Sequence, residues 1–194
     1  GQSADDFIKT LSPGSLEVPG VLFLAAGCST EIAEDVIGNM NNISVSHDNC
    51  PHQVILCGVE EDIRKAKLAL EDMRVLCQIL PFRSGFHSIL FDNYVDPHRA
   101  HFSSIKVSRP HTPVWSATLA RPFPSEESEV RDVAIRHLTE RVQFRATVDA
   151  LYETGIRIFI QCGAASVSGF IGDTLRGKDH IVLSAADDTR SGFH

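Results

Sequence analysis

The sequence has no long apolar run. Among its 194 residues the longest uninterrupted apolar stretch is Val21–Ala26. A membrane-spanning helix needs about 20 such residues. No basic segment followed by an apolar one stands near the start, as it would in a secretory signal. Glycine and proline, 13 and 9 residues, follow no period, which excludes a collagen-like chain. We therefore expect a protein without membrane contact.

Cysteine is sparse and follows no pairing pattern. The five cysteines are an odd number, are widely spaced and form no CxxC pair. In a chain long enough to bury a normal core, this indicates reduced thiols in a cytoplasmic protein. One cluster of candidate ligands, His47, Cys50, His52 and Cys57, has spacings of 3, 2 and 5, which match no structural zinc site. We expect no bound metal.

Basic residues are scarce in the first part of the chain. Residues 1–80 contain 5 Lys or Arg against 12 Asp or Glu, whereas residues 81–194 contain 13 of each kind. The first part therefore carries the whole net charge of −7, which repels phosphate backbones, and we expect no nucleic-acid partner. The asymmetry also predicts two structural regions that meet near residue 80.

Residues 20–80 carry the clearest secondary-structure pattern. Residues 1–19 are polar and punctuated by glycine and proline, which is typical of a linker or tail, with one short helix at 5–11. Apolar periodicity then predicts strands at 21–26, 43–47, 53–57 and 75–80, and helices at 29–40 and 60–73. This β-α-β-β-α-β order is that of a ferredoxin-like unit.

Residues 81–194 alternate helices and strands less regularly, which is typical of α/β architecture. The pattern predicts helices at 98–104, 125–138, 144–154 and 166–175, and strands at 113–117, 156–161 and 181–183. Residues 163–166 are either a helix start that binds an anion or, with more weight, a structural turn. A basic patch is either a dock for an acidic partner or a solvated face; it comprises Arg83, His98, Arg99, His101, Lys106, Arg109 and His111.

One histidine lies in the loop where the two regions meet. The loop Gly85-Phe86-His87-Ser88 follows the last strand of the acidic unit, and junctions between regions gather functional polar residues. His87 is therefore a candidate general base, and a surface or structural histidine is the alternative. The sequence contains no GxSxG nucleophile motif, and none of its cysteines is a good nucleophile candidate.

Several short motifs in a fixed order give the chain a resemblance to a known family. A strand at 20–27 is followed by NCPHQVILCG (49–58), PFRSGFHS (81–88), PVWS (113–116), RVQF (141–144) and GIRIFIQCG (155–163). In this order they resemble the malonyl-CoA:acyl-carrier-protein acyltransferase family, especially the acyltransferase domains of type I polyketide and polyunsaturated-fatty-acid-type synthases. The resemblance covers residues 20–183.

The resemblance implies a ferredoxin-like subdomain at 20–80, followed at 81–194 by the C-terminal half of an α/β-hydrolase-like subdomain. In the family, the serine of a GHSxG motif attacks the thioester of malonyl-CoA. A histidine takes the serine proton and then activates the phosphopantetheine thiol of an acyl carrier protein. By that match His87 is the general base. The family's serine lies upstream of the matched segments and is absent from this sequence, so we expect the isolated chain to be inactive.

The resemblance also implies further site residues. A backbone carbonyl that orients the family's histidine maps to about Glu140, next to Arg141, which replaces the usual proline. Phe86 favours a malonyl over a methylmalonyl unit, whereas Ser84 fits neither pattern; Ser84 and Asn49 complete the substrate-binding residues that the match implies. It implies no bound cofactor beyond the substrate malonyl-CoA and the phosphopantetheine of the carrier protein.

The implied partners are an acyl carrier protein and either the upstream half of the acyltransferase domain or other synthase domains. Strands 114–117 and 156–161 are expected in one mostly parallel sheet whose other strands this sequence does not supply. Unpaired edges and apolar faces need cover, so we expect either a partner segment or self-association. A non-catalytic module that docks a carrier protein is the alternative function.

Overall fold

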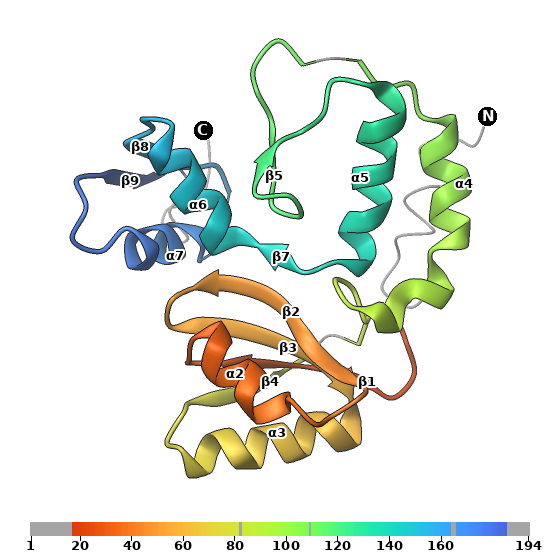
Figure 1. The fold of residues 1–194 in the computed structure, drawn as a ribbon, viewed down its shortest axis with the longest axis vertical. Helices are drawn as coiled ribbons and strands as arrows, with labels where there is room; N and C mark the ends of the chain where they lie inside the picture. Colours follow the sequence, from red (N-terminus) through yellow and green to blue (C-terminus); the bar gives the residue numbers. More distant parts are fainter. Residues whose placement is uncertain (1–16, 82, 109, 164–165, 186–194) are drawn as a thin grey trace, which may run out of the picture.

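The computed structural model describes residues 17–81, 83–108, 110–163 and 166–185, and the expected helix at 5–11 lies outside them. The predicted β-α-β-β-α-β order is confirmed (Figure 1). Its elements are β1 (Val21–Ala26), α2 (Thr30–Ile37), β2 (Ile43–Cys50), β3 (Gln53–Val59), α3 (Glu60–Asp72) and β4 (Cys77–Leu80).

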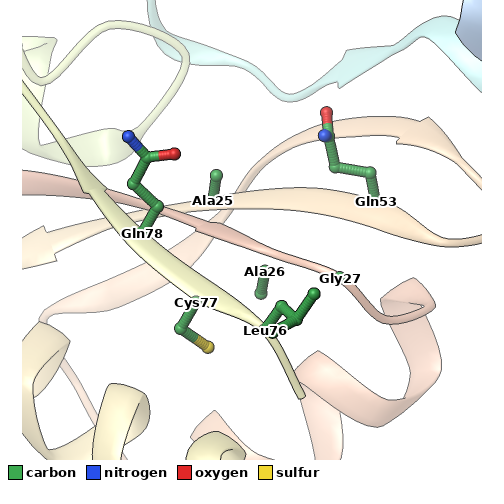
Figure 2. Close-up of a pocket in the computed structure, with 7 residues that line it drawn as sticks. All are labelled: Ala25, Ala26, Gly27, Gln53, Leu76, Cys77 and Gln78. Atoms are coloured by element: carbon green, nitrogen blue, oxygen red, sulfur yellow. The ribbon is translucent and has the colours of Figure 1, made fainter.

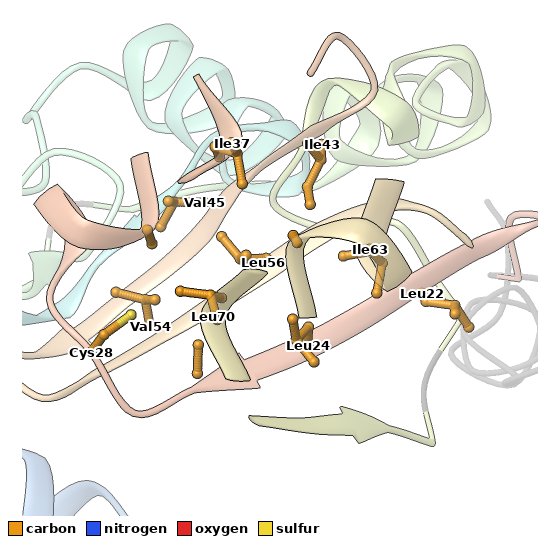
Figure 3. Packing of buried hydrophobic residues seen from close by; sticks show 13 residues of the cluster. Leu22, Leu24, Cys28, Ile37, Ile43, Val45, Val54, Leu56, Ile63 and Leu70 are labelled. Atoms are coloured by element: carbon orange, nitrogen blue, oxygen red, sulfur yellow. The ribbon is translucent and has the colours of Figure 1, made fainter. Parts of the chain in front are cut away.

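These elements form an antiparallel sheet in the order β4-β1-β3-β2, with α2 and α3 on one face (Figure 1). Successive side chains of a strand point to opposite faces. Leu22 and Leu24 of β1 therefore face the helices, in a cluster of 13 buried residues (Figure 3). Ile63 and Leu70 of α3 close this core without any exposed surface. Burial of this cluster is what holds the unit together.

Local signals set the ends of these elements. Ser29 caps α2, with its Oγ accepting the amide hydrogen of Ile32 at 3.4 Å. The strand predicted to end at residue 47 runs on to Cys50, because Cys50 still pairs with Gln53 across the hairpin. The turn then needs only Pro51 and His52.

The second face of the sheet is covered by the following part of the chain. Val21, Phe23 and Cys57 share a buried cluster with Phe91 and Ile135. The covering elements are the 3-10 helix η2 (Ile89–Tyr94), α4 (Asp96–Ser104) and α5 (Glu127–Thr139). The two regions therefore share a core across the sheet.

A fifth strand, which the sequence pattern did not predict, joins the sheet from the second region. It is β7 (Val142–Gln143), which runs parallel to β2 and leads directly into α6 (Phe144–Glu153). Arg145 of α6 binds the buried Asp48 of β2 through Nε, 3.0 Å from each carboxylate oxygen. Arg141 donates to the Val45 carbonyl at 3.1 Å. This segment is thus bonded to the first sheet by both backbone and side chains.

The remaining strands form two small sheets. The strands β5 (Trp115–Ser116) and β6 (Arg121–Pro122) are antiparallel, whereas β8 (Ile158–Gln161) and β9 (Ile181–Ser184) are parallel and connected through α7 (Val167–Thr174). In the residues described these two strands lie in separate sheets, so the expectation that 114–117 and 156–161 belong to one sheet whose other strands this sequence does not supply stays a prediction. Each of these strands pairs with a later strand of the chain, and no strand in the described ranges bridges the two pairs.

One face of the β8–β9 pair packs against α6 and α7, and the other is exposed to solvent. Its inner side chain Phe159 packs on Val148 of α6 and on Ile171 and Leu175 of the α7 segment. The outer side chains form two cross-strand pairs and are more than half exposed: Ile158 with Ile181, and Ile160 with Leu183. We call these four side chains the outer β8–β9 face.

Candidate active site

His87 lies at the junction of the two regions, in the loop between β4 and η2. Its backbone φ is 60°, a left-handed conformation that costs a residue with a Cβ about 1–2 kcal/mol. Gly85 has a φ of 71° and approaches Val18 so closely that a Cβ would lie 3.1 Å from it. Ser88 caps η2, accepting from the Leu90 amide at 3.3 Å and donating to the Gly85 carbonyl at 2.8 Å. Strain held in place by its surroundings is typical of functional loops.

Hydrogen bonds from the end of α5 fix the His87 ring. Its Nδ1 lies 2.6 Å from the carbonyl oxygen of His137, and its backbone amide donates to the Leu138 carbonyl at 2.8 Å. A carbonyl oxygen only accepts, so Nδ1 carries the hydrogen. In the neutral ring Nε2 then keeps its lone pair and is the proton-accepting atom.

The orienting carbonyl lies three residues before the predicted position. The Glu140 backbone also acts on the pKa of His87, which it raises, after the His137 backbone in size. The carboxylate of Glu140 is bound to Arg136, with Nε 2.6 Å from Oε1. The last turn of a helix leaves carbonyl groups without helical partners, and the His137 carbonyl, near the end of α5, is one that His87 uses.

Two further imidazoles lie against His87: His47, which the sequence suggested only as a metal-ligand candidate, and His137, which no sequence pattern singled out. The rings of His47, from β2, and His137, from α5, each have centroids 4.7 Å from that of His87, in edge-to-face arrangements. Nδ1 of His47 lies 2.9 Å from Oγ of Ser46, and Nδ1 of His137 lies 2.7 Å from Oγ1 of Thr118. The site is therefore a cluster of three rings drawn from both regions.

Burial lowers the pKa of all three imidazoles. Desolvation, followed by the charge of His137, lowers the pKa of His87 to about 4, against the opposing effect of its backbone hydrogen bonds. Desolvation, followed by His87 and His137, lowers the pKa of His47 to about 3. Desolvation also lowers the pKa of His137. All three rings are uncharged at neutral pH, as a general base must be before it accepts a proton.

The predicted substrate residues occupy separate places around this cluster. Phe86 lies beside His87, with ring centroids 6.1 Å apart, and packs on Phe91 at 4.4 Å. Ser84 is half-buried in the same loop. Asn49 is buried in the β2–β3 hairpin, where its amide donates to Oε1 of Gln53 at 3.0 Å. Of these three residues, Phe86 is the one whose ring contacts that of the candidate base.

The described residues contain no group of three or more His, Cys, Asp and Glu that could hold a metal ion. Burial, as the largest effect, raises the pKa of Cys50 and of Cys57 to about 11, so these thiols stay protonated and are poor nucleophiles. No described helix has both the length and the apolar character needed to cross a bilayer. The basic patch and the turn at 163–166 lie partly outside the described residues.

A cavity of ≈ 380 Å³ lies at a different place in the fold, beside β1 and β4 (Figure 2). It is lined by Ala25, Ala26, Gly27, Gln53, Leu76, Cys77 and Gln78. None of the predicted site residues lines it. It therefore lends no support to a site at His87.

Comparisons with known proteins give related sequences, although no family model matches. The chain is 25% identical over 163 residues to a polyunsaturated fatty acid synthase of Thraustochytrium sp., covering 80% of this chain and 6% of that protein. It is 24% identical over 157 residues to the polyketide biosynthesis malonyl CoA-acyl carrier protein transacylase BaeC of Bacillus velezensis, covering 79% of this chain and 54% of that protein. The chain thus spans about half of this transacylase and a small part of the synthase.

Solved structures share the fold. The acyltransferase domain from the second module of the salinomycin polyketide synthase matches with a TM-score of 0.81 and 17% identity, over 91% of this chain and 42% of that one. The malonyl CoA-acyl carrier protein transacylase of Coxiella burnetii matches with a TM-score of 0.79 and 20% identity, over 86% of this chain and 54% of that one. The predicted resemblance is confirmed: the chain has the fold of acyltransferase domains and is related in sequence to polyketide and polyunsaturated fatty acid synthases and to malonyl-CoA transacylases.

Proposed function

We propose that this chain is the histidine-bearing part of an acyltransferase. The enzyme would move a malonyl-type acyl group from coenzyme A to the phosphopantetheine thiol of an acyl carrier protein, with His87 as general base. The geometry of His87 carries the proposal: Nδ1–H is held by the His137 carbonyl, and Nε2 keeps its lone pair. The substrate and the carrier protein are those named for the related transacylases.

In this mechanism Nε2 of His87 acts twice. It first takes the proton of a serine hydroxyl while the serine oxygen attacks the thioester carbonyl, and it then passes that proton to the departing sulfur of coenzyme A. In the second half it takes the thiol proton of phosphopantetheine while the sulfur attacks the acyl-serine ester. The proton returns to the serine oxygen, so His87 and the serine are again in their starting protonation states. The His137 carbonyl stabilises the imidazolium that forms in each half.

The serine must come from a segment that this sequence does not contain, because the 194 residues hold no GxSxG motif. The chain spans 54% of BaeC, which leaves room for such a segment in a protein of that kind. We propose that the serine-bearing segment packs against this chain and completes the site beside His87.

The outer β8–β9 face is the surface we propose for that partner. Parallel sheets are normally covered on both faces, and a pair of strands is not stable alone. Ile160 and Leu183, a cross-strand pair, are 60% and 52% exposed. Such side chains favour contact with another apolar surface. Association of two copies of the chain through this face is the competing arrangement.

We propose that Phe86 restricts the acyl unit at this site. Its ring lies beside His87, where it would narrow the space next to the reacting carbonyl. A misfit of one methyl group changes specificity by about 1–3 kcal/mol, which favours malonyl over methylmalonyl units. Ser84 of the same loop and Asn49 of β2 are the other residues proposed to contact the substrate.

Reconstituted acyl transfer tests the proposal. The chain is mixed with a polypeptide carrying the serine segment of a related transacylase, and malonyl transfer from malonyl-CoA to a carrier protein is measured. We expect transfer by the mixture, none by the chain alone, and a loss of about 100-fold or more with His87→Ala. His180→Ala serves as the control, because Nδ1 of that ring bonds the nearby Lys178 carbonyl, away from the His87 cluster.

Two results would count against it. Undiminished transfer with His87→Ala would contradict the role of His87 as general base. Capture of the carrier protein by the chain, with no transfer in any mixture, would favour a docking module instead.

A further inference from the structure

The imidazoles of His47 and His137 are the chemical groups at the site that the proposed mechanism leaves without a function. Each of their rings has its centroid 4.7 Å from that of His87. They come from β2 and α5, so the cluster exists only when the two regions are packed together. Three titratable rings at this spacing, each partly desolvated, influence one another's protonation.

The hydrogen bonds around His47 define its neutral form. Oγ of Ser46 has one hydrogen, which it donates to the Ile55 carbonyl at 3.0 Å. It therefore accepts from Nδ1–H of His47 at 2.9 Å, and Nε2 of His47 keeps its lone pair. His47 thus presents an uncharged ring edge-on to His87, which a fixed hydroxyl holds in place.

The other titratable and charged groups near His87 are neutral or paired. From β3, Sγ of Cys57 lies 3.4 Å from Oγ of Ser88, and burial raises the pKa of this thiol to about 11, so it is uncharged. At the end of α5, Glu140 is paired with Arg136. On β2, Asp48 is paired with Arg145. The charge that His87 responds to is therefore a proton on a neighbouring imidazole.

We propose that His47 and His137 are positioning residues for His87, and that the three rings hold one proton at a time. When His87 takes a proton during acyl transfer, both neighbours stay neutral and hold its ring plane. When acid protonates His137 first, a second charge beside it is disfavoured about tenfold or more, and His87 stops acting as a base. The inference rests on the proposed function for the role of His87, and the coupling of the rings does not depend on it.

The reduced pKa values agree with this geometry. The charge of His137 is a cause of the lowered pKa of His87, and the charges of both rings are causes of the lowered pKa of His47. At neutral pH none of the three rings carries a second proton.

Nuclear magnetic resonance of the whole chain, labelled in its histidine rings, tests the coupling. We expect His87 in the unmodified chain to stay neutral in its Nδ1–H form on acidification to about pH 5. His137→Gln keeps the backbone carbonyl and an amide that can still bond Thr118, but removes the charge. In that variant we expect the pKa of His87 to rise by about one unit. His180→Gln is the control and leaves it unchanged.

A structural role alone would lower the unfolding midpoint without moving the His87 titration. If His137→Gln does not fold, His137→Asn is the second variant, with the same upward shift expected because it too removes the charge beside His87. A His87 pKa unchanged within about 0.2 units in a folded variant contradicts the inference. The titration needs no serine partner. The expected shift without acyl transfer would therefore contradict the proposed function alone, and transfer without the shift would contradict this inference alone.

Discussion

Residues 21–80 enclose 13 buried residues in one cluster, whereas the β8–β9 layer rests on a cluster of four. The strands β1, β2 and β3 have six to eight residues, whereas β5, β6 and β7 have two each. Burial of apolar surface is the largest favourable contribution to folding. The first region therefore holds most of the stability, and the second depends more on what it packs against.

The difference explains where the candidate site lies. His87 follows the last strand of the large sheet, while the carbonyl that orients its ring comes from α5 of the second region. Each region alone supplies part of the cluster, His47 from β2 and His137 from α5. The geometry of the site therefore depends on the second region being packed on the first.

The largest expected effect is in the core of the first region. Leu24 has no exposed surface, so Leu24→Ala leaves a cavity and should lower the free energy of unfolding by about 3 kcal/mol. Urea unfolding followed by circular dichroism measures it. The control is Leu68→Ala, because Leu68 is 64% exposed and its loss should change stability by less than about 0.5 kcal/mol. Equal effects of the two substitutions would contradict the account of this core.

A smaller effect is expected at the docking of the two regions. Arg145→Ala leaves the Asp48 carboxylate, 11% exposed, without its arginine partner and should destabilise the chain by about 1–3 kcal/mol. Arg64→Ala breaks a more exposed ion pair with Glu60 and should change stability by less than about 0.5 kcal/mol. If Arg145→Ala has as little effect as Arg64→Ala, this ion pair does not join the regions.

A smaller contribution to stability is expected from a pH-dependent contact between the two regions. Burial would raise the pKa of Asp173, but hydrogen bonds from His52, Arg176 and Cys50 together lower it to about 2, from 3.8. Because the folded-state pKa is below the unfolded one, this stabilisation is present above about pH 4 and is lost as the pH falls towards about 2. His52 is 70% exposed, so we expect less than about 1 kcal/mol. In Asp173→Asn this part of the acid dependence should disappear; an unchanged profile would rule the contact out.

The outer β8–β9 face should matter least for the stability of the isolated chain. Ile160→Ser replaces a 60% exposed side chain and should change the free energy of unfolding by less than about 0.5 kcal/mol. It should weaken association with the serine-bearing segment or with a second copy, which sedimentation measures. Leu76→Ser, at an 85% exposed position outside this face, is the control. Identical sedimentation of both variants and the unmodified chain would contradict the proposal that this face binds a partner.

The sequence predicted the first region closely because its periodicity is local. Ser29 caps a helix within its own turn, and the apolar strand at Val21–Ala26 needs no distant residue to be recognised. The strand β7 has only two residues and exists because it pairs with His47 and Asp48, almost 100 positions earlier. No local pattern encodes such a pairing.

Some parts of the candidate site were predictable from local sequence, and others depend on the packed fold. His87 was predicted from its loop and motif. The His137 carbonyl was placed about three residues late, because a backbone group leaves no trace in the choice of side chain. His47 and His137 lie 40 and 50 positions from His87, and only the packed fold brings their rings to 4.7 Å.

The most direct measurement is malonyl transfer to a carrier protein by the chain mixed with a serine-bearing segment, compared between the unmodified chain and His87→Ala. We expect transfer in the first mixture and a loss of about 100-fold or more in the second. Equal transfer by the two mixtures, with both chains folded, would contradict it.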